Sequence, residues 1–223
     1  MLSFKKVNTS FIFIVLPLFL MLRSEQSLSN WSIFIFIIIW LVLTIIGSFH
    51  IRWNYFLKAN HKNDQIKENA VALTFDDGPN KDFTPKVLEL LKKYNAKASF
   101  FCIGKNVNKH PDILNEIAKN GHLIGNHSFS HKNSFGFLST KEVISELEET
   151  RKIIEEKVNL KVKYFRPPFG VTNPNIANAV KKLNLHTFGW SIRSLDTIAK
   201  DPEKVYHKIV SKLKKGDIVL MHD

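Results

Sequence analysis

The sequence predicts an α/β domain built on a parallel sheet, preceded by one or two transmembrane helices at the N-terminus. Two observations point to this fold class. From about residue 70 onwards, short apolar runs typical of strands alternate with amphipathic stretches typical of helices. Such alternation indicates a parallel sheet covered by helices, either open or closed into a barrel. Before that point, the first fifty residues hold two apolar blocks and few charges.

Residues 1–50 form the predicted membrane anchor. The block Trp31 to Phe49 carries no charge over nineteen residues, which suits a spanning helix of roughly 20 residues, although a buried core helix is the alternative. The block Phe11 to Leu22 is shorter and contains Pro17, so we expect a second span forming a hairpin, or else a signal-like or interfacial segment. Because no cleavage site of small residues is evident, a retained anchor is favoured.

The side of the membrane that the domain faces is not fixed by the sequence. Lys and Arg residues flank the second apolar block about equally, so the number of spans decides the orientation. Residues 51–69 are polar and mixed, and they are predicted to be a linker to a domain at 70–223.

The elements of this domain are predicted from periodicity and from residues that start or stop helices. Gly121 is the expected stop of one helix, residues 139–142 resemble a capping box, and Asp201 before Pro202 caps the last helix. The predicted strands are 70–73, 97–103, 122–125, 162–165, 186–190 and 217–221, and the predicted helices are 84–94, 111–120, 139–159, 175–183 and 201–214.

The formal charge is +12, of which residues 1–50 contribute +2. This surplus favours anionic surroundings such as lipid head groups or an acidic polymer. No basic stripe interleaved with aromatic residues is found, so we expect no nucleic-acid partner, and no feature indicates a partner protein. The single cysteine, Cys102, excludes an internal disulfide, and its apolar neighbours predict a buried core residue.

Two adjacent carboxylates, Asp76 and Asp77, follow the first predicted strand of the domain. Gly78 and Pro79 break the strand at this point. Ligands of parallel α/β sheets gather at the carboxyl ends of strands, and a turn there lets both side chains reach one cavity. Two carboxylates held close repel each other unless a cation or a proton separates them. A plain surface turn is the alternative reading.

Two imidazoles, His127 and His131, lie four positions apart in a histidine-rich turn. On a helical turn this spacing places both on one face, where they can chelate one ion, although two surface histidines show the same pattern. With Asp77 the set becomes three nitrogen and oxygen ligands, typical of a catalytic metal that keeps positions open for water and substrate. We expect one divalent cation, zinc first, with cobalt, nickel or manganese as alternatives.

Taken together, residues 74–79 and 127–131 resemble two motifs of the polysaccharide deacetylase family, the NodB-homology or carbohydrate esterase family 4 enzymes. Three further stretches resemble the remaining motifs of this family: residues 166–170, 190–196 and 220–222. The match covers about Ala70 to Asp223. The resemblance implies a distorted, incomplete (β/α) barrel of the NodB type, which agrees with the alternation described above.

The resemblance also implies roles for the residues around the carboxylate pair. Asp76 would be the general base, and Arg166 would bind and orient it. Asp77, His127 and His131 would be the metal ligands. A divalent cation lowers the pKa of water and polarises an amide carbonyl, and a nearby carboxylate can take the proton of the water as attack begins.

The remaining motifs imply the groups that act on the leaving amine and the acetyl group. His222 would be the general acid, because an amine leaves poorly unless protonated, and Asp196 would pair with it. Trp190 and Leu220 would form an apolar wall for the acetyl methyl. The backbone N–H of Phe169 would help to bind the oxyanion.

Two departures from the family pattern are visible. The fourth motif usually reads Asp-x-x-Asp-Trp, whereas here Arg193 replaces the first aspartate and Thr197 the tryptophan, while Asp196 is kept. The substrate contacts at this rim are therefore in question. Phe169 replaces the tyrosine that the family often has at this position. The replacement has little effect if the backbone N–H of the residue, and not its side chain, binds the oxyanion. No closing helix follows His222, so we expect this end to be less well packed than in relatives.

The function expected from this sequence is a metal-dependent hydrolase that removes acetyl groups from an N-acetylated polysaccharide. The substrate would be an N-acetylglucosamine polymer such as peptidoglycan or a chitin-like oligomer. An O-acetyl esterase acting on polysaccharide, and a catalytically silent metal- or glycan-binding envelope protein, are the alternatives. The protein would be anchored in a membrane through its N-terminal segment, and a cell-wall substrate would place the domain outside the cytoplasm.

Overall fold

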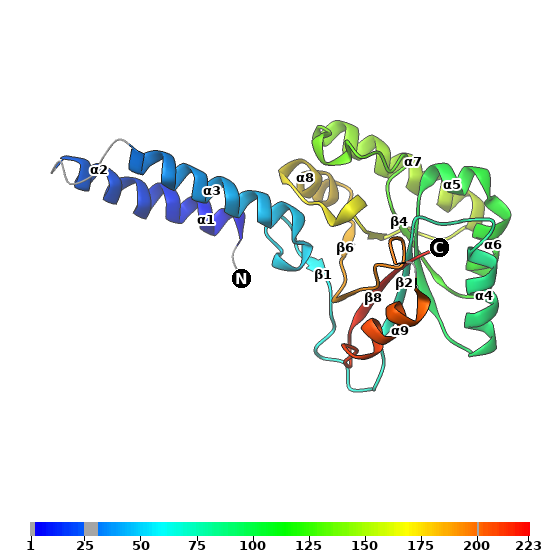
Figure 1. The fold of residues 1–223 in the computed structure, drawn as a ribbon. Coiled ribbons are helices and arrows are strands. Elements are labelled where there is room, and N and C mark those ends of the chain that lie inside the picture. Colours follow the sequence, from blue (N-terminus) through cyan, green and yellow to red (C-terminus); the bar gives the residue numbers. More distant parts are fainter. Residues whose placement is uncertain (1–2, 25–30, 200) are drawn as a thin grey trace.

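The computed structural model describes residues 3–24, 31–199 and 201–223. An N-terminal helical hairpin lies beside an α/β domain (Figure 1). Helix α1 (Phe4–Ser10), a π-helical turn (Phe11–Val15) and α2 (Leu16–Ser24) run on as one helix, and α3 (Trp31–Phe49) returns alongside it. Most of the expected hairpin connection, residues 25–30, lies outside the described residues.

The first apolar segment is longer than its sequence pattern indicated. Among the described residues, Phe4–Ser24 is the one helix long and apolar enough to cross a membrane by length and composition, whereas the described apolar part of α3 is the shorter Phe34–Phe49. Pro17 does not interrupt the first helix. The N–H of Leu16 donates to the carbonyl of Phe11 in a wider turn, which makes room for a residue that lacks an N–H and crowds the preceding turn.

The sheet of the domain contains eight described strands, and every neighbouring pair in it is parallel. Their order is β1-β6-β5-β4-β3-β2-β8-β7. The sheet curls, but β1 and β7 do not pair in the part of the chain that the structure describes, which leaves an incomplete barrel and confirms the predicted fold class. The strands are β1 (Ala59–Asn60), β2 (Ala72–Asp76), β3 (Ala98–Cys102), β4 (Leu123–Asn126), β5 (Tyr164–Phe165), β6 (His186–Phe188), β7 (Ile192–Arg193) and β8 (Ile218–His222).

The helices of the domain begin and end close to their predicted bounds, except that the last one ends at Val210 and not near residue 214. The capping box at Ser139 and Glu142 is present, and Gly121 follows α6 with a φ of 72°. One short helix, α5, and three 3₁₀ turns have no counterpart in the predicted pattern. The helices are α4 (Thr84–Lys93), α5 (Gly104–Lys109), α6 (Pro111–Lys119), α7 (Thr140–Val158), α8 (Pro174–Lys182) and α9 (Pro202–Val210), and the 3₁₀ turns are η2 (Ile51–Trp53), η3 (Phe135–Phe137) and η4 (Pro168–Gly170).

Part of the expected linker at 51–69 belongs to the sheet. Ala59 and Asn60 form β1, which pairs with β6 at one edge. Ile51 and Tyr55 are also buried, at 4% and 2% exposed, so the base of the hairpin packs firmly on the domain. A strand of two residues is too short to show a period, which is why the sequence did not reveal it.

Two apolar clusters lie between the sheet and its helices. One surrounds Phe75 and Phe100 beneath α4, α6 and α7, and the other surrounds Phe165 and Ile176 beneath α7 and α8. Cys102 is fully buried in the first cluster, as predicted, and burial raises the pKa of its thiol well above the usual value. Because the strands run parallel, their carboxyl ends emerge together at one rim of this core.

Candidate active site and metal centre

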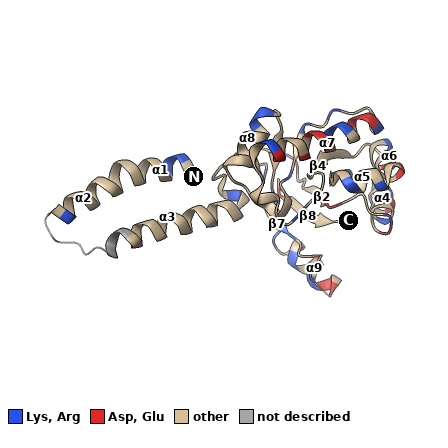
Figure 2. Cartoon of the chain, turned by 90° about the horizontal axis from the view of Figure 1, so that it is seen from above, with Lys and Arg blue, Asp and Glu red and all other residues tan. Residues whose placement is uncertain are grey.

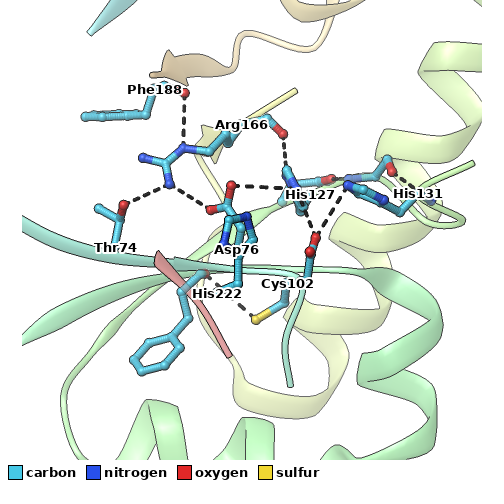
Figure 3. A network of polar contacts seen from close by, with 12 residues as sticks. Thr74, Asp76, Cys102, His127, His131, Arg166, Phe188 and His222 are labelled. Atoms are coloured by element: carbon cyan, nitrogen blue, oxygen red, sulfur yellow. Dashed lines mark hydrogen bonds and ion pairs between the residues drawn. The ribbon is translucent and has the colours of Figure 1, made fainter. Parts of the chain in front are cut away.

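Asp76, the last residue of β2, is held by a buried arginine. Arg166 is 0% exposed, and its Nη1 donates to Asp76 Oδ1 at 2.7 Å and to Thr74 Oγ1 at 2.8 Å. Its Nη2 donates to the Gly189 carbonyl at 2.8 Å, and the guanidinium lies 4.2 Å from the ring centre of Phe101. Burial lowers the pKa of Arg166 against the opposing effect of Asp76. This fixed cation keeps one oxygen of Asp76 occupied and leaves Oδ2 toward the histidines (Figure 3).

Asp77 begins the turn after β2 and points away from the core. Its φ of 76° places it in the left-handed region, so its side chain does not continue the alternation of the strand. Asp77 Oδ1 lies 3.5 Å from His127 Nε2 and 3.4 Å from His131 Nε2. Burial alone would raise the pKa of Asp77, but the charge interactions with His127 and the neighbouring histidines outweigh this effect and lower it.

His127 and His131 converge on Asp77, but not as neighbours on a helix. Residues 127–131 form an irregular loop in which Ser128 and His131 have φ values of 62° and 48°. The expectation of a helical turn was therefore wrong, although the two imidazoles do come together, with ring centres 4.8 Å apart. The physical reason is that side chains satisfy the backbone N–H groups of the loop: Asn126 Oδ1 accepts from Ser128, and Glu146 accepts from Phe129 and Ser130.

The donor atoms of these three residues fit a divalent cation. One ligand atom from each of Asp77, His127 and His131 lies within 4.8 Å of the others. Asp77 Oδ1 is buried and has no hydrogen-bond partner within the described residues, which is costly unless something else binds it. His127 Nδ1 lies 2.7 Å from the Arg166 carbonyl, so Nδ1 carries the proton and Nε2 keeps its lone pair. Burial, followed by the charge of His127, lowers the pKa of His131 and favours its neutral form.

On the other side of the cavity, His222 is paired with Asp196. His222 Nδ1 lies 2.7 Å from Asp196 Oδ1, and the backbone N–H of His222 donates to Oδ2 at 2.8 Å. Burial alone would lower the pKa of His222, but the hydrogen bond and charge of Asp196 outweigh it, so the pKa is raised. His222 ends β8 directly opposite Asp76 of β2 in the parallel register. The candidate acid and base are therefore fixed neighbours across one strand pair.

A cavity of about 270 Å³ joins these groups. Trp190 and Leu220 line its wall, together with Phe169, whose ring centre lies 4.7 Å from that of His131. The backbone N–H of Phe169 makes no hydrogen bond within the described part of the chain. Arg193, which departs from the family pattern, also lines the cavity, and its guanidinium lies 5.9 Å from the Trp190 ring centre. The rim therefore carries a positive charge where an aspartate was expected.

Residues with strained backbone conformations cluster around this cavity. Non-glycine residues with positive φ occur in each loop that surrounds it: Asp77, Ser128, His131, Phe169 and Leu195. Such conformations cost energy and persist only where surrounding contacts enforce them. Their concentration at one rim is typical of a functional site.

The site contains positioning residues that the sequence did not single out. Glu146 of α7 binds two N–H groups and the hydroxyl of Ser130, at 2.7 to 3.0 Å. Asn126 binds the Leu147 carbonyl through Nδ2 and Ser128 through Oδ1. Thr74 links Arg166 to the Val219 carbonyl. The available signals were that Asn126 directly precedes His127 and that Thr74 opens the motif at 74–79, whereas Glu146 lies on a helix surface with many similar charges.

Comparison with known proteins agrees with this geometry. Residues 63–188 match the polysaccharide deacetylase family profile. A peptidoglycan-N-acetylglucosamine deacetylase of Bacillus cereus is 35% identical over 152 residues, which cover 68% of this chain and 55% of that protein. A chitooligosaccharide deacetylase of Azorhizobium caulinodans is 34% identical over 157 residues, covering 70% of this chain and 74% of that protein.

A solved structure extends the comparison to the fold. The protein BA3943 of Bacillus anthracis, described as a CE4 family pseudoenzyme, superposes with a TM-score of 0.66 and 30% identity. The superposition covers 70% of this chain and 55% of that protein. This chain thus spans only about half the length of the first relative and of this neighbour. The extent of the profile match and the similarity in sequence and fold lead to one conclusion: this chain belongs to the polysaccharide deacetylase family.

Proposed function

We propose that this protein is a metal-dependent hydrolase that removes the acetyl group from an N-acetylated saccharide containing N-acetylglucosamine, as found in peptidoglycan and chitin-like oligomers. The observation that carries the proposal is the convergence of three groups on one cavity. These are the Asp77, His127 and His131 donor set, the Asp76–Arg166 pair and the Asp196–His222 pair. The names of the relatives from Bacillus cereus and Azorhizobium caulinodans support the same reaction class.

Asp77, His127 and His131 would hold the cation. Two nitrogen donors and one oxygen donor suit zinc, with cobalt, nickel or manganese as alternatives. When bound, the metal supplies Lewis acidity, which makes a water molecule more acidic and polarises the acetamide carbonyl. The orphaned Oδ1 of Asp77 and the free Nε2 of His127 support this assignment.

Asp76 would accept the proton of the attacking water. Its Oδ1 is held by Arg166 at 2.7 Å, which restricts the rotation of the carboxylate. Its Oδ2 faces the metal ligands, 3.7 Å from His127 Nε2. The base would therefore be oriented before the substrate arrives.

His222 would donate a proton to the leaving amine. The raised pKa keeps more of its imidazole protonated near neutral pH, and its Nδ1 contact with Asp196 leaves Nε2 for the substrate. The free N–H of Phe169 would stabilise the oxyanion, a kind of donor worth roughly 3 kcal/mol. Trp190 and Leu220 would contact the acetyl methyl.

We also propose that the hairpin anchors the protein in a membrane. Its two helices lie side by side, and the Trp40 indole donates to Asn8 Oδ1 at 2.8 Å (Figure 1). Large apolar side chains are exposed on both helices, and each helix rises about 30 Å, the thickness of a hydrocarbon core. The domain would then lie outside the bilayer at the open end of the hairpin.

The hairpin also bears on which side the domain faces. If both helices cross, the start of α1 and the domain share one side of the membrane. On that side six basic residues lie within about 20 sequence positions of the helix ends, and on the other side there is one; these are Lys5, Lys6, Arg52, Lys58, Lys62 and Lys67 against Arg23. The positive-inside rule then favours a cytoplasmic domain, opposite to the outward placement that a cell-wall substrate implies.

Acetate release tests the proposed reaction directly. Full-length protein in detergent, stripped with a chelator and resupplied with zinc, is expected to release acetate from a soluble N-acetylglucosamine tetramer only when the metal is present. Asp76→Asn is expected to abolish release while zinc binding is retained. Release that survives both the chelator and Asp76→Asn would contradict the proposal.

The second candidate is a metal- or glycan-binding protein without catalysis. The similarity to the BA3943 pseudoenzyme supports this candidate. Arg193 supports it too, because this residue departs from the family pattern at the rim of the cavity. In the same assay, this alternative predicts zinc binding and tetramer binding with no acetate. Release from an O-acetylated glycan alone would instead indicate an esterase.

A further inference from the structure

A second cavity lies between the end of the hairpin and the catalytic rim. It has a volume of about 420 Å³, and Ser48 and Phe49 at the end of α3 form one wall. Gly136 and Phe137 of η3 and Val171, which follows η4, form the others. A volume of this size is in the range of small-molecule sites, yet none of the groups assigned to the reaction occupies it except Phe169.

The walls of this cavity are fixed relative to each other. The Thr172 N–H donates to the Ser48 carbonyl at 2.9 Å, which joins the end of α3 to the loop after η4. Gly47 lies so close to the ring of Tyr55 that a Cβ would meet it at 2.4 Å. Ile51 is buried against Gly189. The end of α3, which forms one wall of the cavity, is therefore held against the domain.

The cavity opens toward the region where the membrane surface would lie. The apolar run of α3 ends at Phe49, which is 68% exposed, and Phe137 beside it is 91% exposed. Exposed apolar side chains grouped in this way mark an interaction surface. A hydrocarbon chain could pass from the adjacent leaflet into this cavity without crossing water.

The same cavity adjoins the catalytic site. Phe169 lines both cavities, and its ring lies against His131. The head group of a lipid whose chain lay along Phe137 and Phe49 would therefore reach the rim where the acetamide is attacked. A single cavity of this volume suits one chain better than the two chains of a glycerolipid.

We propose that this cavity binds the hydrocarbon chain of a single-chain lipid carrier, so that the substrate is a lipid-carried N-acetylated saccharide taken from the leaflet beside the domain. This inference rests on the proposed deacetylation. It also agrees with a domain held at the membrane surface, because a hydrocarbon chain keeps its saccharide at that surface, beside the end of the hairpin.

A kinetic comparison tests the inference. Full-length protein in phosphatidylglycerol vesicles is given N-acetylglucosamine joined through diphosphate to a polyprenyl chain, or the soluble tetramer, and acetate is measured. We expect kcat/KM to be at least about tenfold higher for the lipid-carried substrate. Phe137→Ser is expected to remove most of this preference by raising KM for the lipid-carried substrate.

The matched control is Phe83→Ser, which alters a phenylalanine that is 58% exposed on the domain but lies outside the cavity. It is expected to keep the preference. Equal kcat/KM for the two substrates, or equal behaviour of the two variants, would overturn the inference.

Photolabelling gives a readout that does not depend on activity. Polyprenyl phosphate with a diazirine in its chain is expected to label residues 133–137 and 169–173 in addition to the hairpin, and excess unlabelled lipid-carried saccharide should compete. Labelling confined to the hairpin would contradict the inference. If neither substrate releases acetate, the proposed function fails, and the labelling pattern still decides whether the cavity binds the chain.

Discussion

At the scale of single residues, the site works through pairs in which one partner sets the state of the other. Arg166 fixes Asp76, the Arg166 carbonyl fixes the tautomer of His127, and Asp196 sets the charge of His222. Each pair joins segments far apart in the chain. The chemistry of each reacting group therefore depends on a partner that local sequence does not reveal.

The Asp196–His222 pair predicts a pH effect. Asp196 raises the pKa of His222, and an acid acts only while protonated, so activity should fall as pH rises through that pKa. In Asp196→Asn the protonated imidazole of His222 loses the negative charge beside it, so its pKa falls. The decrease of kcat/KM at high pH is then expected to begin at a lower pH. Rate profiles against pH, with the exposed Asp82→Asn as control, test this. An unmoved basic limb would count against His222 as the acid.

Glu146 is expected to act through the histidine loop. Glu146→Gln removes the charge that binds the Phe129 and Ser130 N–H groups, and loss of such a supporting contact lowers metal affinity by roughly 10- to 100-fold. Zinc titration calorimetry measures the change. Glu149→Gln, an exposed glutamate on the same helix, is the matched control, and equal affinities in the two variants would contradict the role.

At the scale of elements, the short helix α5 supports the same loop from the other side. The N–H groups of Gly104 and Lys105 donate to the carbonyls of Ser128 and Phe129 at 3.0 Å. The first turn of α5 thus satisfies its own N–H groups with the backbone that carries the histidines. The positions of His127 and His131 therefore depend on how closely α5 packs against the loop that carries them.

Gly104 permits that approach. A Cβ at this position would lie 2.5 Å from the Phe129 ring and 2.7 Å from Thr150 Oγ1. Gly104→Ala is expected to destabilise the fold by about 1–3 kcal/mol, as overpacking does, and to weaken zinc binding because the loop must shift. Urea unfolding and zinc titration measure both effects. Lys105→Ala, which alters an exposed neighbour, should change neither, and a similar zinc affinity in Gly104→Ala would refute the coupling.

At the scale of the whole molecule, the proposed membrane anchor would fix how the domain meets the membrane. Phe4 N–H donates to the Tyr55 carbonyl at 2.8 Å, so the start of the first helix and the end of the second meet at the domain. Lys and Arg side chains gather at this end, whereas the described part of the far end carries Arg23 alone (Figure 2). The arrangement favours a domain held close to the cytoplasmic surface.

Cysteine labelling tests this topology. The native Cys102 is fully buried, so single cysteines can be introduced without removing it. A membrane-impermeant maleimide applied to intact cells is expected to label Ser24→Cys at the far end of the hairpin and to spare Ser211→Cys on the domain until the membrane is permeabilised. Labelling of Ser211→Cys in intact cells would show an outward-facing domain.

The sequence alone predicted the features that depend on local pattern or on short motifs. Strand and helix alternation predicted the parallel sheet, because side-chain period follows backbone geometry. The resemblance named the family, and together with the spacing of Asp77, His127 and His131 it identified residues that the fold brings within 4.8 Å. The resemblance also predicted the pairing of Asp196 with His222, and Asp196 Oδ1 lies 2.7 Å from His222 Nδ1 in the structure.

The tertiary structure alone decided how those residues are held. The irregular path of residues 127–131 depends on Glu146 and α5, which lie elsewhere in the chain. Strand β1 exists because an edge of the sheet pairs with it, and the cavity beside Phe137 exists because the end of α3 is joined to the loop after η4. Local sequence determines which backbone conformations are low in free energy, whereas contacts between distant segments select the one that is populated.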